Sequence, residues 1–273
     1  MKKMITEEPM TKIVERTVKS PSAPRLQLAW RTDSYGTHDA RLAEIVANLL
    51  TNSGETGLID ININQSQKAL RAMAYDSPFK TYGNFSMVIV PKNDQTLEQA
   101  KQLLLSQIEL VKKGEFQEWL IPAIINDMKI RRMKSFETAD GLATALYGSY
   151  INNQDWEKEL SEIAEYEKIT KADVVKFANE FFKDNYVVIK KEKGVNDKLV
   201  RVENPGITPI KLNKDAQSPF LKSILNEKSS EIKPEFVDFA KAIKTDQIAG
   251  KKASFVENKY NDIAQTYFIF PFG

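Results

Sequence analysis

The sequence predicts an α+β fold, a two-layer sandwich in which a mainly antiparallel sheet is covered by a layer of helices. Strand patterns come first in the chain, a block of helical patterns follows, and one more strand pattern closes that block. This order differs from the strict strand–helix alternation of parallel α/β folds. The chain has 273 residues, of which 42% are hydrophobic, so it can bury a substantial core.

The first part of the chain predicts most of the sheet. Residues 1–20 are polar and lack periodicity, and we interpret them as a linker. Apolar and polar residues then alternate, as in a half-buried strand, before a helical pattern begins with Thr37 as its candidate N-cap. The expected elements are a strand over 25–32, a helix over 39–50, a short helix over 58–68, and strands over 69–75 and 84–90.

Helical periodicity dominates the next hundred residues. Thr96 and Gln99 have the spacing of a capping box, and Gly114 is placed to end the helix that they begin. Further helices are expected over 116–136, 139–151, 156–166 and 170–182. Residues 186–193 return to a strand pattern, and their lysine-rich end favours a position at the edge of the sheet.

The domain organisation follows from where these patterns weaken. Residues 21–195 are interpreted as one module, and the proline-rich residues 196–246, with a short amphipathic segment at 220–225, as an interdomain connector. Residues 247–273 predict a hairpin, with strands over 247–256 and 263–270 joined by polar residues. Because an isolated hairpin is marginal in water, it must pair with the first module, with another molecule, or with the rest of a further domain.

Composition excludes several kinds of site. The chain has no cysteine and a single histidine, His38. Zinc sites without cysteine normally need at least two imidazoles and a carboxylate, so we expect no metal site and no catalytic residue in this chain. No Gly-x-Ser-x-Gly elbow and no Gly-x-Gly-x-x-Gly or Walker motif occurs.

The charge balance and the lack of long apolar stretches limit the partners. Lysine and arginine number 39 against 37 acidic residues, a net charge of +2, so we expect no nucleic-acid partner. The basic run at 129–134 and the acidic residues at 155–167 are both interpreted as solvated helix faces. No stretch approaches the roughly 18 apolar residues of a membrane span, and the first residues do not resemble a signal peptide. The compartment, cytoplasm or periplasm, stays open.

The order of elements resembles one module of the pitrilysin/insulinase superfamily of zinc metallopeptidases. The resemblance covers about residues 15–195 and includes the segment 57–65, Gly-Leu-Ile-Asp-Ile-Asn-Ile-Asn-Gln. Three later segments, 232–236, 248–251 and 258–273, resemble the opening of a following module. The resemblance implies a sheet covered by helices that helps to enclose a chamber in which peptides are degraded, with the terminal hairpin as the start of the next module.

The superfamily's catalytic module carries H-x-x-E-H on a helix, where two histidines bind zinc. The corresponding helix here has His38, no histidine four residues later, and Glu44 six residues after His38. The resemblance therefore implies a zinc-free, non-catalytic module. Zinc is expected only in a partner module, either in the same chain or in a partner subunit.

Zinc-free modules of the superfamily also grip the substrate backbone with an arginine and a tyrosine seven residues apart. Those places are held here by Asn64 and Arg71. Asn64 can hydrogen-bond a peptide without a guanidinium fork, and Arg71 cannot replace a phenol. Asn64 and Arg71 are the candidate peptide contacts, and the alternative is that they are an ordinary helix-surface residue and strand-end residue.

Two functions remain in competition. The first is a non-catalytic, structural or peptide-chamber module of a zinc metallopeptidase that degrades or processes peptides. The alternative is a stand-alone scaffold or binding protein that reuses the fold without peptidase activity. A nucleic-acid-binding domain would rest only on the basic run at 129–134.

Overall fold

The computed structural model describes residues 8–195, 206, 213, 215–228, 233–234 and 236–271. The chain divides into two compact units, Met1–Asp197 and Lys198–Gly273, which are described separately below. The start of the expected linker, much of the expected connector with Ile232 and Glu235, and the last two residues lie outside the described part. None of the described helices is long and apolar enough to cross a membrane.

The first unit is built on a five-stranded sheet with the strand order β1-β5-β2-β4-β3. Its strands are β1 (Val14–Ser20), β2 (Arg25–Thr32), β3 (Arg71–Ser77), β4 (Gly83–Val90) and β5 (Tyr186–Lys193). β1 and β5 are parallel, and the other neighbouring pairs are antiparallel. The sheet is therefore mainly antiparallel, as expected.

Two expectations about this sheet are wrong. The linker interpretation fails for Val14–Ser20, which forms edge strand β1 instead. Because most β1 side chains are exposed, its sequence lacks the apolar contrast that marks a strand, and pairing with β5 supplies the order. β5 in turn lies inside the sheet rather than at its edge, with β1 on one side and β2 on the other.

The helices of the first unit lie where the sequence predicts them. They are α1 (His38–Leu50), the π-helix η1 (Asp60–Gln65), α2 (Leu97–Lys113), α3 (Leu120–Ser135), α4 (Ala139–Ile151), α5 (Trp156–Tyr166) and α6 (Lys171–Phe181). Thr37 caps α1 by accepting a hydrogen bond from the backbone of Ala40. Thr96 and Gln99 form the expected capping box of α2, and Gly114 ends that helix with a left-handed φ of 69°.

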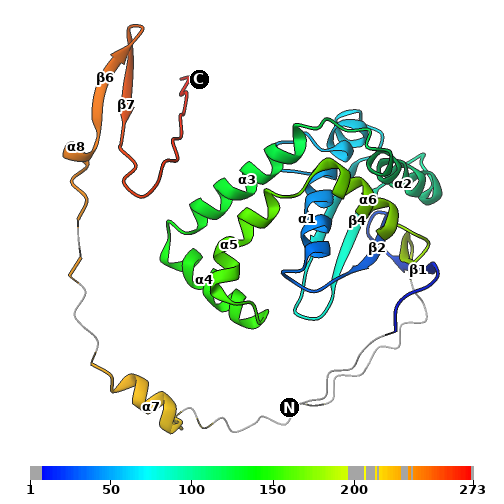
Figure 1. Ribbon diagram of the computed structural model, residues 1–273, viewed down its shortest axis with the longest axis horizontal. Helices are drawn as coiled ribbons and strands as arrows, with labels where there is room; N and C mark the ends of the chain where they lie inside the picture. Colours follow the sequence, from blue (N-terminus) through cyan, green and yellow to red (C-terminus); the bar gives the residue numbers. More distant parts are fainter. Residues whose placement is uncertain are drawn as a thin grey trace. The chain divides into compact units, whose positions relative to one another are not determined.

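The helices cover one face of the sheet, which confirms the α+β sandwich (Figure 1). α1 and α2 lie against the strands, α6 contacts both of these helices, and α3 contacts α1. The core between the layers is filled by alternate residues of the central strands together with one face of α1. These include Leu26, Leu28 and Trp30 of β2, Phe85, Met87 and Ile89 of β4, and Ile45 and Leu49 of α1.

The second unit contains two short helices and a hairpin. They are α7 (Pro219–Leu225), which matches the expected amphipathic segment, α8 (Phe239–Ala242), β6 (Lys244–Ile248) and β7 (Lys251–Phe255). The hairpin turns at Ala249 and Gly250, not over 257–262 as the sequence suggests. Both turn residues have positive φ angles, 47° and 73°, which suits a two-residue hairpin turn. The described residues from 263 to 270 form no strand.

Candidate functional site

The helix that corresponds to a zinc helix, α1, does not offer a zinc ligand set. His38 is its first residue, and most of the following turns are buried in the core. Within the described residues, no group of three or more histidine, cysteine, aspartate or glutamate side chains could hold a metal ion. The side chains present around α1 therefore do not fit a catalytic zinc.

What α1 borders instead is a cavity of about 560 Å³ lined by ionisable side chains. They come from the start of α1, the end of β3, α3 and α5, so segments far apart in the sequence meet there. The ionisable lining residues are Tyr35, Arg41, Glu44, Asp76, Arg131, Arg132, Glu159, Glu162 and Tyr166.

Two carboxylates in this cavity are neutralised by arginines. Arg41 of α1 donates from Nε to Glu162 Oε1 at 2.8 Å and from Nη2 to Glu162 Oε2 at 3.2 Å. Arg132 of α3 lies 3.2 Å from Glu159 Oε1, and Tyr35 Oη donates to Glu159 Oε2 at 2.9 Å. Because Glu159 and Glu162 are buried, these contacts compensate charges that would be costly alone.

The other two carboxylates, Glu44 and Asp76, form no ion pair with the described residues. Glu44 accepts a hydrogen bond from the Tyr166 hydroxyl, and burial raises its pKa. Burial, and after it the charge of Glu44, together raise the pKa of Asp76 to about 7. Near neutral pH the Asp76 carboxyl is therefore protonated in part of the molecules.

Sequence reasoning missed the acidic half of this cluster. Glu159 and Glu162 were expected on a solvated face, but both are buried, at 7% exposure each. The signal was present in the spacing, because they share a helical face with Ile163 and Tyr166, which contact the core. Arg132, expected on a solvated face of α3, likewise points into the cavity, and Arg131 pairs with Asp127.

Of the candidate peptide contacts, Asn64 lies in η1 and Arg71 is the first residue of edge strand β3. The Asn64 side chain accepts from the backbone N–H of Ala72 at 2.8 Å and donates to the Ala72 carbonyl at 2.9 Å. The Asn64 amide thus bonds the backbone N–H and carbonyl of Ala72 at the edge of the sheet, where β3 has no neighbouring strand. Arg71 is exposed and belongs to the opposite face of the strand from Ala72. Asn64 and Arg71 are only seven positions apart in the sequence. The Asn64 side chain is engaged by the backbone of Ala72, whereas Arg71 is exposed, so the two side chains do not form one site.

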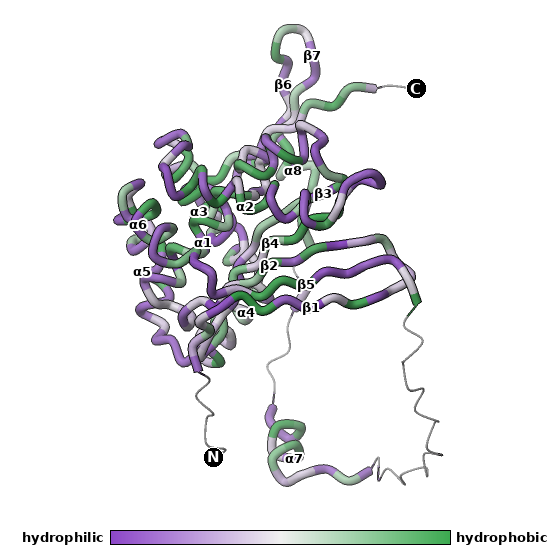
Figure 2. The backbone as a smooth tube through the Cα atoms, turned by 90° about the vertical axis from the view of Figure 1, so that its right-hand side faces the viewer, coloured by the Kyte–Doolittle hydropathy of each residue, from purple (hydrophilic) through white to green (hydrophobic). Residues whose placement is uncertain are grey.

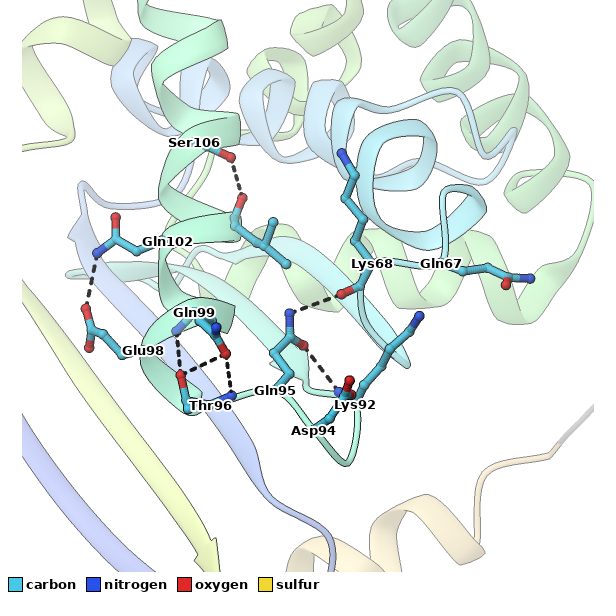
Figure 3. Close-up of a pocket in the computed structure, with 11 residues that line it drawn as sticks. Gln67, Lys68, Lys92, Asp94, Gln95, Thr96, Glu98, Gln99, Gln102 and Ser106 are labelled. Carbon is cyan, nitrogen blue, oxygen red and sulfur yellow. Dashed lines mark hydrogen bonds between the residues drawn. The ribbon is translucent and has the colours of Figure 1, made fainter.

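A second hollow, of about 920 Å³, lies at the start of α2 and is lined mainly by polar side chains (Figure 3). Gln95 bridges its two walls, since Nε2 donates to the Lys68 carbonyl at 3.1 Å and Oε1 accepts from the Lys92 backbone at 3.2 Å. Thr96 and Gln99 are occupied by the capping box. The amides of this hollow therefore mainly hold its own walls, and they provide no nucleophile or acid–base pair.

Comparison with known sequences bears on the first part of the chain. Residues 2–128 match the family model of the peptidase M16 inactive domain. No curated protein matches the chain.

Solved structures of the same fold include a protease from Helicobacter pylori, with 15% identity and a TM-score of 0.60 over 66% of this chain and 44% of that one. The M16 inactive domain from Pseudomonas fluorescens is 13% identical, with a TM-score of 0.58 over 71% of this chain and 46% of that one. An inactive peptidase domain from Bordetella parapertussis is 13% identical, with a TM-score of 0.55 over 63% of this chain and 93% of that one. The chain spans less than half the length of the first two proteins.

Proposed function

Because the chain carries a non-catalytic module of the M16 peptidase family, the pitrilysin/insulinase group expected from the sequence, we propose that it is a structural and peptide-chamber module of a zinc metallopeptidase. The module is not catalytic by itself. Its partner is a catalytic module that carries the zinc, either in the same chain or in a partner subunit, and its substrate is a peptide.

The observation that carries this proposal is how α1 is used. In place of metal ligands, α1 presents Arg41 and Glu44, and both bind side chains of α5, Glu162 and Tyr166. These contacts attach α1 firmly to the outer helices. A helix held in this way contributes to a wall rather than to a reaction centre, which supports a structural role beside a catalytic module.

The proposal is tested by reconstitution. The full chain is mixed with an M16 catalytic module that carries H-x-x-E-H, taken from the neighbouring reading frame, and cleavage of an unstructured peptide is followed. We expect no cleavage by the chain alone, and EDTA-sensitive cleavage that rises when this chain is added to the catalytic module. Zinc content, measured on the purified chain after dialysis, is expected to be far below one equivalent.

Two results would contradict the proposal. One equivalent of tightly bound zinc, with EDTA-sensitive cleavage by the chain alone, would make the module catalytic. A chain that neither binds the catalytic module nor changes its rate would instead support the stand-alone scaffold.

A further inference from the structure

The sheet of the first unit has one face that the described helices leave uncovered. Figure 2 shows β1, β5, β2 and β4 side by side, with α1, α5 and α6 on one side of them. In β2, Leu26, Leu28 and Trp30 point into the core, and the residues between them belong to the other face. The strand pairings extend this alternation across all five strands. We call the uncovered side the open face.

All charged residues at the strand positions of the open face are basic. The pairings place Arg16 of β1, Arg25 and Arg31 of β2, Arg71 of β3, and Lys191 and Lys193 of β5 there, with no aspartate or glutamate. The whole chain has a net charge of only +2, so this excess is local. The acidic Glu15 and Glu192 belong to the helix-covered side of the same strands.

Three of these cations lie in one row across the sheet. Arg25 is directly opposite Lys191, and Arg71 is directly opposite Val90. The pairing of β2 with β4 runs through Leu26 and Ile89, so one residue further brings Arg25 beside Val90. Like charges placed opposite each other on neighbouring strands are unfavourable. Negative charge from a partner would reduce the repulsion between the cations of this row.

The described part of the chain pairs few of these cations with carboxylates. Within the described residues, Arg16, Arg25, Arg71, Lys191 and Lys193 form no ion pair with a carboxylate; Lys191 donates instead to the Ser22 hydroxyl at 2.6 Å. Lys190, the next residue along β5, points to the other side and lies 2.6 Å from Glu15 and 3.5 Å from Glu98.

Beside the basic row, the middle of the open face is mainly apolar, with Gln27 and Ser86 as polar residues. One row contains Ile189, Gln27, Val88 and Met73, with Arg16 of β1 at its end, and the next contains Val14, Val187, Ala29, Ser86 and Tyr75. Single-stranded nucleic acid is usually held by several aromatic side chains on which bases stack. Tyr75 is the single aromatic residue at the strand positions of this face, so its chemistry favours a polypeptide over a nucleic acid.

We propose that the open face binds a polypeptide segment that alternates acidic and aliphatic residues. Its carboxylates pair with Arg25, Lys191 and Arg71, while its aliphatic side chains cover the partly exposed Ile189 and Met73 on either side of the buried Val88. This inference rests on the proposed function in taking a peptide as the ligand, and it adds the substrate class, acidic and partly apolar.

The test is a fluorescence anisotropy titration of the full chain with a labelled twelve-residue peptide of alternating glutamate and valine. A peptide with lysine in place of every glutamate is the matched probe. We expect the acidic peptide to bind and the lysine peptide not to bind. Raising the salt from 50 to 500 mM should weaken binding at least tenfold, because screening acts on exposed charges.

Two double variants locate the site. Arg25→Glu with Lys191→Glu should raise the Kd for the acidic peptide at least tenfold. Lys113→Glu with Lys176→Glu makes the same charge change at exposed positions of α2 and α6 and should leave the Kd within twofold. Thermal melts of both variants show whether each is folded, and charge-swap rescue by the lysine peptide on the first variant provides a second readout.

Equal binding of the two peptides, an unchanged Kd in the open-face variant, or stronger binding of a single-stranded oligonucleotide of the same length would overturn this inference. Its failure is distinguishable from failure of the proposed function. The binding titration contains no catalytic module, whereas reconstitution with a neutral peptide reports on the module's role without requiring the basic row.

Discussion

Arg41 and Glu162 lie 121 positions apart in the chain and form a two-pronged ion pair that joins α1 to α5. The side chains are 13% and 9% exposed, so the pair is shielded from most of the solvent. The same guanidinium donates to the carbonyl of Gly36 at 2.9 Å, before the start of α1. One side chain thus anchors the entry to α1 and its contact with the outer helices.

Replacing one partner of this pair should destabilise the first unit strongly. Arg41→Met leaves the Glu162 carboxylate buried without its cation, which costs about 3–5 kcal/mol in comparable pairs. The free energy of unfolding, measured in urea, should fall by that order. Arg131→Met is the matched control, because Arg131 is 46% exposed and pairs with Asp127, and it should cost at most about 1 kcal/mol.

A double variant separates the two contributions. Arg41→Met with Glu162→Leu removes both charges and should recover most of the lost stability. If the double variant is as unstable as Arg41→Met alone, the loss comes from packing of the arginine stem rather than from the unpaired carboxylate.

Asp76 should make the protein more stable as the pH falls from 8 toward 5. Burial raises its pKa from 3.8 to about 7, so the folded state holds a proton that the unfolded state has released. This contribution is fully present below pH 3.8 and is lost as the pH rises to about 7, with a slope of at most about 1.4 kcal/mol per pH unit. The pKa of Glu44 is also raised and acts with the same sign.

The measurement is the melting temperature of the full chain and of Asp76→Asn between pH 5 and 8. The variant keeps the shape of the side chain without its charge, so it should be more stable than the parent at pH 8 and should show a flatter profile. Parallel pH profiles for the two proteins would mean that Asp76 is ionised throughout this range. Asp127→Asn, which changes an exposed carboxylate, is the control.

Asn64 is expected to act mainly on stability through its two bonds to Ala72. Asn64→Ala leaves the N–H and carbonyl of Ala72 without these partners and should lower the free energy of unfolding by about 1–3 kcal/mol. Asn64→Asp keeps the acceptor, loses the donor and adds charge near Asp60, so it should not restore stability. Hydrogen exchange at Ala72 reports the effect directly. Unchanged protection there would contradict this role.

At Gly57 the chain passes close to the backbone of Leu50 at the end of α1, and a substitution tests whether this approach needs glycine. A Cβ at this position would lie 2.3 Å from the carbonyl oxygen of Leu50, and backbone cannot move away cheaply. Gly57→Ala should therefore destabilise the fold by about 1–3 kcal/mol in a urea titration. Gly148 of α4 has open space around its Cβ position, so Gly148→Ala should be neutral or stabilise by up to about 1 kcal/mol. Equal effects of the two changes would refute the steric argument.

Local signals in the sequence predicted most of the elements correctly. The capping box of Thr96 and Gln99, the stop at Gly114 and the alternation in β2 depend on residues within a few positions of each other. Edge strand β1 and the turn at Ala249 and Gly250 were missed, because an exposed strand has little apolar contrast and an Ala-Gly turn carries a weaker signal than Asn-Gly.

The ionisable cavity was harder to predict than the elements around it. Glu159 and Glu162 lie in a sequence rich in charges, and such runs usually stay in solvent. Their burial depends on Arg41 and Arg132, which come from α1 and α3. No spacing within α5 reveals that these cations are close.

The sequence by itself determined the fold class and most helix limits, and its single histidine and lack of cysteine are the ground for expecting no zinc site. Only the tertiary structure decided that Arg41 meets Glu162, that β5 lies inside the sheet, and that the cations of several strands share one uncovered face. The physical reason is the separation along the chain of the residues that interact. Caps and periodicity act within a few residues, whereas ion pairs and strand neighbours join residues that only folding brings together.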